Sequence, residues 1–410
     1  MSVHDRPIAL PEMGIGDVRG AKPIDPFPRK GRDLRLDFFR GLSLFFIFID
    51  HIPNNFLGYF TLRSIAFSDA AEVFIFISGY TAALVYGRSM SQHGALLATA
   101  QVYRRVWQLY VAHIILFVIY IVAISFLARR FMDSELINEF NVAGLVDHAT
   151  ETLGQGLLLK FKPVNLDVLP LYIVLMGFFP PVLWMMLRQP DLTMLASIVL
   201  WLLARYFGWN FNAYPAGTWY FDPYCWQVIF IFGSWCALGG AKKAAWIINS
   251  KIALYFGVAY LIFALIMTMA GRFPDLGAMF PDWLYSTFNP NDKTFMAPYR
   301  FLHFIVIAML VVRFIPKDWP ALEWKGFDPA IVCGQQSLAV FCVGVFLSFV
   351  AHFMLTLSSG SVLAQIVISL AGIAIMTIVA YYISWSKRQD KPVPKPAAKP
   401  ATGASASASA

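Results

Sequence analysis

Two residues suited to transfer chemistry, Arg40 and His51, lie eleven positions apart in the first strongly apolar stretch of the chain. At 100° per residue, a step of eleven residues ends about 20° past three full turns, so both share one helix face with a rise of about 16 Å between them. Titratable side chains inside a membrane-length apolar helix are costly and mark functional positions. This face therefore presents a cation near one membrane surface and a candidate general base near the other.

Carboxylates near the histidine could supply the partner that an imidazole base requires. Asp50 directly precedes His51, and the next apolar stretch opens with Asp69 and Glu72. A carboxylate that accepts a hydrogen bond from the ring selects its tautomer and raises its basicity. We favour Glu72, because it shares a helix face with Gly79, where a glycine permits close helix contact. The alternatives are that Asp69 caps the helix and that Glu72 pairs with another nearby donor.

The composition shows which elements must position these residues. Of the 410 residues, 58% are hydrophobic and only 14% are charged, whereas soluble proteins carry about 25% charged residues. The apolar residues form solid blocks of roughly 18–25 residues, each long enough to cross a bilayer. Such blocks exclude a soluble enzyme, a disordered chain and a disulfide scaffold. They also argue against a membrane β-barrel, in which apolar and polar residues alternate. We predict an all-α polytopic integral membrane helical bundle of about ten transmembrane helices. The expected spans are 36–53, 70–87, 103–127, 167–187, 192–207, 225–240, 252–271, 299–315, 331–357 and 361–385.

The distribution of charge predicts the topology of the chain. We expect a polar cytoplasmic tail over 1–35, a ten-span membrane domain over 36–385 and a disordered cytoplasmic tail over 386–410. Lys and Arg are concentrated on the side that holds both tails, which places both termini in the cytoplasm. The net charge of +8 then reflects topology and anionic lipid rather than nucleic acid, which we do not expect as a partner. The four cysteines show no Cys-x-x-Cys or Cys/His spacing, so we predict no metal site.

An ordered set of motifs resembles the acyltransferase-3 superfamily and, more closely, the OpgC family. The set comprises Leu36–Gly41, Asp50-His51, Glu72-Val73-Phe74 with Ser78-Gly79, Tyr103-Arg104-Arg105 with His113, Leu169–Tyr172, Pro223 to Gln227, and Gly334–Leu338. The resemblance covers residues 33 to about 345. One departure is Gln108, which stands where the superfamily often has the second arginine of an Arg-x-x-Arg pair. It leaves open whether Arg104 or Arg105 carries the expected role.

The resemblance implies a multi-pass O-acyltransferase of the bacterial inner membrane. It would move an acyl group, succinyl in the OpgC family, from a cytoplasmic CoA thioester to hydroxyls of a periplasmic glucan. Acyl-CoA would be a co-substrate, with no bound cofactor. The implied partners are the acyl-CoA donor, the glucan acceptor, the lipid bilayer and other membrane proteins of glucan biosynthesis.

The resemblance also suggests roles for individual residues. Arg40, Arg104 and Arg105 would bind the CoA phosphates, since a guanidinium holds two oxygens at once. His51 would deprotonate the sugar hydroxyl, with Glu72 or Asp50 stabilising the imidazolium; an acyl-histidine intermediate stays open. The candidates for the acceptor contact or the oxyanion donor are Asn54, Ser78, His113, Gln227 and His303.

The competing hypothesis is a polytopic transporter or flippase of a small molecule or an acylated carbohydrate. Such a protein also carries many spans and buried charges, and it often shows related halves with interrupted helices in matched positions. We find no such repeat between 36–207 and 225–385, and the buried charges cluster in the first three spans. The pattern therefore favours the acyltransferase.

Overall fold

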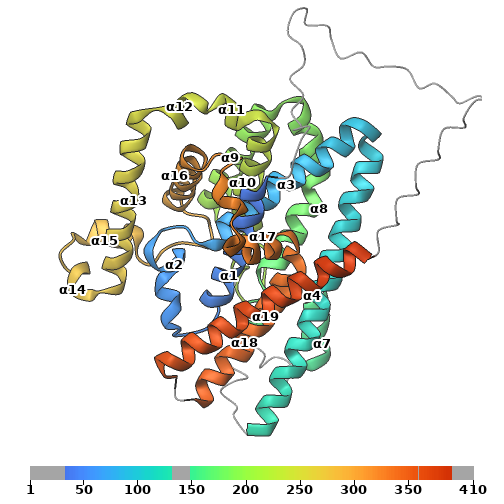
Figure 1. Ribbon diagram of the computed structural model, residues 1–410, viewed down its shortest axis with the longest axis vertical. Coiled ribbons are helices and arrows are strands. Elements are labelled where there is room, and N and C mark those ends of the chain that lie inside the picture. The colour runs from blue at the N-terminus through green and yellow to red at the C-terminus, as the bar shows by residue number, and fades with distance from the viewer. Residues whose placement is uncertain (1–32, 132–147, 359, 390–410) are drawn as a thin grey trace, which may run out of the picture.

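The computed structural model describes residues 33–131, 148–358 and 360–389, and within them the chain is built from helices (Figure 1). The long helices are α1 (Leu34–Asp50), α3 (Ala70–His93), α4 (Ala95–Phe131), α8 (Val168–Arg188), α9 (Pro190–Phe207), α10 (Pro223–Trp235), α13 (Lys251–Arg272), α16 (Pro298–Phe314), α18 (Ser337–Leu357) and α19 (Val362–Gln389). The shorter elements are η1 (Phe56–Phe60), α2 (Leu62–Ile65), α7 (Ala149–Leu157), η2 (Cys236–Gly240), α11 (Ala241–Lys243), α12 (Ala245–Asn249), α14 (Pro274–Gly277), α15 (Asp282–Phe288), η3 (Pro320–Glu323), η4 (Lys325–Phe327) and α17 (Asp328–Gln335). Most of the predicted tails, 1–32 and 390–410, lies outside the described residues.

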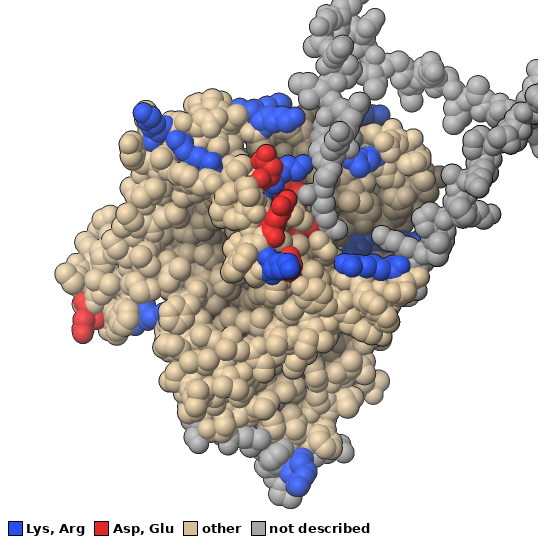
Figure 2. Space-filling view, in the orientation of Figure 1, with Lys and Arg blue, Asp and Glu red and all other residues tan. Residues whose placement is uncertain are grey.

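Eight helices of the described chain are long and apolar enough to cross a membrane. They begin at Ala70, Ala95, Val168, Pro190, Pro223, Lys251, Ser337 and Val362. The helices α1 and α16, each of 17 residues, lie where the other two spans were predicted. These findings confirm the all-α polytopic membrane bundle. Figure 2 agrees, because most of the face shown carries no charged side chain.

Two predicted span boundaries need correction. The segment between the predicted spans 70–87 and 103–127 is helical except at Gly94, since α3 continues to His93 and α4 begins at Ala95. Gly94 alone makes the turn, with a φ of +86° that glycine adopts without strain. The predicted span 331–357 is broken between α17 and α18 at Gln336, whose amide nitrogen donates to Ser384 Oγ at 3.0 Å.

Glycines bring α1 and α3 close to their neighbours near the centre of the bundle (Figure 1). A Cβ atom at Gly41 of α1 would lie 1.8 Å from the carbonyl oxygen of Ala330 in α17. A Cβ atom at Gly79 of α3 would lie 2.0 Å from the carbonyl oxygen of Phe230 in α10. The close helix contact predicted at Gly79 is confirmed, and its partner is α10. Both crossings require glycine because the backbones themselves touch.

Candidate active site

Two cavities lie at opposite ends of α1. The first, here the Arg40 cavity, has a volume of about 1050 Å³ and is lined by Arg40. The second, here the His51 cavity, has a volume of about 1070 Å³ and is lined by Asp50 and His51. One helix of 17 residues therefore supplies a guanidinium to one cavity and an imidazole to the other.

Basic side chains dominate the Arg40 cavity. Its cationic lining residues are Arg35, Arg40, Arg88, Arg105, Lys242, Lys243 and Lys317, and its acidic ones are Asp33 and Asp37. Arg35 is paired with Asp33 at 2.8 Å. Arg40 Nη2 donates to Thr81 Oγ1 at 2.7 Å and to the carbonyl oxygen of Ile77 at 3.0 Å, which holds the guanidinium against α3. The excess of positive charge suits a ligand that carries several phosphates.

The structure distinguishes Arg104 from Arg105. Arg105 lines the Arg40 cavity, whereas Arg104 is exposed and is not among the lining residues described for it. Arg105 Nη1 donates to Oε1 of Gln108 at 3.3 Å. Gln108, which departs from the superfamily pattern, therefore contacts the arginine that faces the cavity. This geometry makes Arg105 the better candidate for phosphate binding.

His51 sits at the C-terminal cap of α1, where its ring lines the His51 cavity. Its backbone N–H donates to Ile47 O at 3.1 Å, and the side-chain amide of Asn165 donates to His51 O at 3.4 Å. The ring nitrogen Nδ1 is buried and has no hydrogen-bond partner within the described residues. Asn54, with a φ of +55°, lines the same cavity three residues further on. The ring is thus positioned by the backbone on either side of it, leaving it available to a ligand.

The His51 cavity also carries more positive than negative charge. Its cationic lining residues are Arg63, Lys160, Lys162, Arg272 and Lys293, and its carboxylates are Asp50 and Asp167. The ammonium of Lys162 lies 3.8 Å from the centre of the Trp219 ring. Burial lowers the pKa of Lys162 to about 8, although the charge of Asp167 opposes this. An anionic ligand in the cavity would stabilise the charged lysine.

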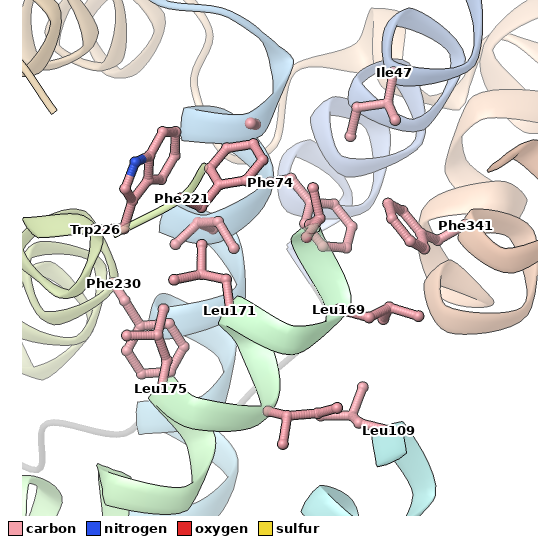
Figure 3. Close-up of a cluster of buried hydrophobic side chains, with 14 of the residues drawn as sticks. Ile47, Phe74, Leu109, Leu169, Leu171, Leu175, Phe221, Trp226, Phe230 and Phe341 are labelled. Atoms are coloured by element: carbon pink, nitrogen blue, oxygen red, sulfur yellow. The ribbon is translucent and has the colours of Figure 1, made fainter. Parts of the chain in front are cut away.

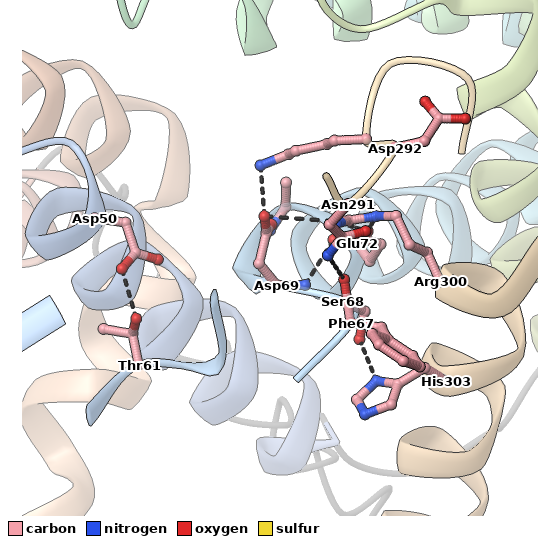
Figure 4. Close-up of polar contacts among 12 residues, drawn as sticks. Asp50, Thr61, Phe67, Ser68, Asp69, Glu72, Asn291, Asp292, Arg300 and His303 are labelled. Carbon is pink, nitrogen blue, oxygen red and sulfur yellow. Dashed lines mark hydrogen bonds and ion pairs between the residues drawn. The ribbon is translucent and has the colours of Figure 1, made fainter. Parts of the chain in front are cut away.

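Asp50 lines the His51 cavity, but its carboxylate does not bond to the neighbouring ring. Its Oδ1 accepts a hydrogen bond from Thr61 Oγ1 at 2.5 Å (Figure 4). Its carbonyl oxygen accepts one from Arg63 Nη1 at 2.8 Å. These contacts tie the end of α1 to the segment that follows it. Asp50 therefore holds the backbone beside His51 in place.

The expected pairing of Glu72 with His51 is not formed. Glu72 is fully buried, and Oε1 accepts from Arg300 Nε at 2.9 Å and also from Nη2 (Figure 4). Its second oxygen, Oε2, accepts from the backbone N–H of Asp69 at 2.9 Å, and Asp69 caps α3 in return by accepting from Ala71. A buried carboxylate is stabilised most by a guanidinium, and α16 places one against the start of α3. Both alternatives stated above are therefore found at this end of α3: Asp69 caps the helix, and Glu72 pairs with a donor other than His51.

The buried network extends from Glu72 to the His51 cavity. Asp69 Oδ2 lies 3.5 Å from Arg300 Nη2 and accepts from Lys293 Nζ at 2.5 Å. Lys293 also lines the His51 cavity. Sequence reasoning missed Lys293 and Arg300 because they lie more than 220 positions after their partners. The one indication of either residue in the sequence was that Arg300 stands at the start of an apolar stretch. Glu72 thus positions the Lys293 ammonium, which lines the His51 cavity, through the side chains of Arg300 and Asp69.

Two further candidates, Ser78 and Gln227, lie away from the His51 cavity. Ser78 lines the Arg40 cavity, where its hydroxyl donates to Phe74 O at 2.7 Å. The amide of Gln227 joins α10 to α9 through Ser197, at 2.6 Å from its hydroxyl.

Two histidines are buried in the helix bundle. His303 Nδ1 lies 2.8 Å from Ser68 Oγ, beside the Arg300 network (Figure 4). His113 is buried against Phe117, with neither ring nitrogen hydrogen-bonded to any residue that the structure describes. Neither histidine lines the His51 cavity. Of the five candidates for an oxyanion or acceptor contact, only Asn54 is found there.

Apolar side chains separate the two cavities. Phe74, Leu169 and Phe341, here called the apolar partition, line the Arg40 cavity, whereas Val168 lines the His51 cavity. The rings of Phe74 and Phe341 stack with centroids 5.9 Å apart. Figure 3 shows the three side chains converging from α3, α8 and α18, with Ile47 of α1 beside them. Val168 and Leu169 are consecutive residues of α8, so the start of α8 contributes to the walls of both cavities.

Comparison with known proteins identified one family. A family model described as "OpgC protein" matches residues 32–388, which include the long helices described above apart from the last residue of α19. No curated protein and no solved structure matches the chain.

Proposed function

The chain belongs to the OpgC family, which implies a membrane acyltransferase, and we propose that it carries an acyl group from CoA in the Arg40 cavity to a glucan hydroxyl in the His51 cavity. The observation that carries this proposal is the placement of Arg40 and His51 in separate cavities at the two ends of α1. A donor with several phosphates needs a cluster of cations, and the Arg40 cavity supplies one. An acceptor hydroxyl needs a general base, and the His51 cavity supplies an imidazole.

The donor binds through its phosphates in the Arg40 cavity. Arg40 and Arg105 supply planar guanidinium groups, and Lys242 and Lys243 add positive charge at the rim. The thin acyl-pantetheine arm extends along α1 past the apolar partition. The rise of about 16 Å from Arg40 to His51 is the distance that the arm covers.

Transfer takes place beside the imidazole of His51. The ring accepts the proton of a glucan hydroxyl as the hydroxyl oxygen attacks the thioester carbonyl. The tetrahedral intermediate collapses, the C–S bond breaks, and the CoA thiolate takes up the proton from the imidazolium. The Asn54 amide, which lines the same cavity, donates to the oxyanion.

The protein lies in the bacterial inner membrane with both termini in the cytoplasm. The Arg40 cavity then faces the cytoplasm, because its rim holds Lys242, Lys243 and Lys317, and short loops rich in Lys and Arg stay on that side. The His51 cavity faces the periplasm, where the glucan is found. Each substrate thus reaches its cavity from its own side of the membrane.

The acyl group is succinyl. The excess of cations over carboxylates in the His51 cavity would serve no purpose for an uncharged acetyl group on a neutral glucan. A succinyl group carries a free carboxylate, which the exposed Arg63 at the cavity edge can bind through charge-assisted hydrogen bonds.

The test is a transfer assay with purified protein in lipid nanodiscs, supplied with a neutral glucan and either succinyl-CoA or acetyl-CoA. We expect succinyl transfer to be preferred, and Arg63→Gln to lower the succinyl-to-acetyl ratio of kcat/KM by about tenfold, since one charged hydrogen bond is worth about 1.5–3 kcal/mol. The acetyl rate of the same variant is the internal control: it registers any displacement of His51 that follows from loss of the Arg63 contact with Asp50, so the ratio isolates recognition of the carboxylate. An unchanged ratio would contradict carboxylate recognition, and no transfer from either donor, with glucan instead crossing sealed vesicles, would favour a transporter.

Removal of one donor-site arginine should weaken donor binding selectively. We expect Arg105→Gln to raise the KM for acyl-CoA by about tenfold to a hundredfold, because it removes a charge-assisted contact with phosphate. The KM for glucan should stay the same. Arg104→Gln is the matched control, since it makes the same change at the exposed neighbouring position. Equal effects of the two substitutions would rule out a specific role for Arg105.

A further inference from the structure

A third cavity, of about 790 Å³, forms a groove between α4, α18 and α19. Its walls are mainly apolar and include Ile115 and Ile119 of α4, Phe346 of α18 and Ile375 of α19. Ile115 is 55% exposed and Ile119 is 46% exposed. Because α4 is a membrane-spanning helix, side chains this exposed face lipid. The groove is therefore open to the bilayer along its side.

The groove follows α4 from Arg105 to Ile119. Ile119 lies fourteen positions after Arg105, a rise of about 21 Å along the helix. One leaflet contributes about half of a ~30 Å hydrocarbon layer. The groove is therefore long enough to hold an extended acyl chain from the membrane surface to beyond the midplane.

Positive charge is confined to one end of this groove. Arg105 and Lys387 are its cationic lining residues, and no carboxylate is among the described residues that line it. Lys387 Nζ donates to Gln336 Oε1 at 2.7 Å, and Gln336 is itself held by Ser384. The Lys387 ammonium is thus held at the charged end of the groove.

We propose that the groove binds an anionic glycerophospholipid, with its headgroup between Arg105 and Lys387 and an acyl chain along Ile115 and Phe346. The two cations at one end of the groove match the anionic headgroup, because cations at the membrane surface attract such headgroups. The apolar wall along the rest of the groove matches the acyl chain. The groove shares Arg105, Ser337 and Leu338 with the Arg40 cavity. A bound lipid therefore closes the side of that cavity and orients Arg105. The site does not depend on the proposed reaction.

The experiment measures lipid retention by the full-length protein. The purified protein is mixed with phosphatidylglycerol or phosphatidylcholine of the same chain length, and bound lipid is counted by native mass spectrometry. We expect phosphatidylglycerol to be retained in preference, and Lys387→Gln to weaken its retention about fivefold. Arg388→Gln is the matched control, because it removes the neighbouring exposed charge outside the groove. It should retain phosphatidylglycerol as the unsubstituted protein does.

A second variant tests the apolar part of the groove. Ala112→Trp, which places a large ring among the lining residues, should lower the retention of both lipids, while Lys387→Gln lowers that of the anionic lipid alone. Thermal unfolding of both variants without added lipid reports whether they are folded. Equal retention of the two lipids by the unsubstituted protein, or equal losses in Lys387→Gln and Arg388→Gln, would overturn the proposal. These outcomes involve no acyl transfer, so they separate this site from the proposed reaction.

Discussion

Replacement of His51 by alanine should reduce acyl transfer to glucan by about 10²–10⁴-fold, the usual contribution of a general base. The imidazole lines the cavity proposed for the acceptor, and no described residue there offers a second imidazole. The measurement is the rate at which labelled succinyl passes from CoA to glucan in nanodiscs. The KM for acyl-CoA should change little, because the donor phosphates bind at the other end of α1.

The His51→Ala variant should still fold, which makes the test informative. The buried Nδ1 of the His51 ring has no hydrogen-bond partner among the residues that the structure describes. The backbone contacts of His51 with Ile47 and Asn165 survive the substitution. His93→Ala is the matched control, since His93 lies in the last turn of α3, away from the His51 cavity. Transfer at the unsubstituted rate in His51→Ala would refute the general-base role.

Replacement of Arg300 by methionine should lower the free energy of unfolding by about 3–5 kcal/mol, the usual cost of leaving a buried charge without its partner. Arg300 and Glu72 are almost fully buried, and Asp69 lies 3.5 Å from the same guanidinium. Methionine fills a similar volume but leaves Glu72 without a cation. Thermal and denaturant unfolding in detergent, followed by tryptophan fluorescence, measures the change.

A double variant separates charge from packing at this site. With Glu72→Gln added to Arg300→Met, the fully buried carboxylate of Glu72 no longer faces the methionine, so we expect most of the lost stability to return. Part of the loss should persist, since Asp69 then depends on Lys293 alone. If the double variant is as unstable as Arg300→Met, the loss comes from packing, and the proposed electrostatic role of the pair is wrong.

The close helix contact at Gly79 could be predicted from the sequence, but its partner could not. A glycine on the face of an apolar helix indicates close approach of another helix, which is a local inference. The segment that approaches is α10, around Phe230 and Gly233, about 150 positions later. Similarly, the basic pair Arg104-Arg105 indicated an anion site, but which arginine faces it depends on how α4 is rotated against α8 and α18.

By itself, the sequence determined that the chain is a bundle of membrane helices and that Arg40 and His51 share one helix face, because composition and helical periodicity are local properties. It also offered, as one alternative, that Asp69 caps α3, which the structure confirms, and a cap could be considered from the sequence because it acts within a few residues. Only the tertiary structure decided that Glu72 binds Arg300 and that Arg105 rather than Arg104 lines the Arg40 cavity. It also decided that Asn54 is the one residue among the five acceptor or oxyanion candidates that lines the His51 cavity. Those outcomes depend on which helices meet and on how each is rotated, and packing over the whole bundle sets both.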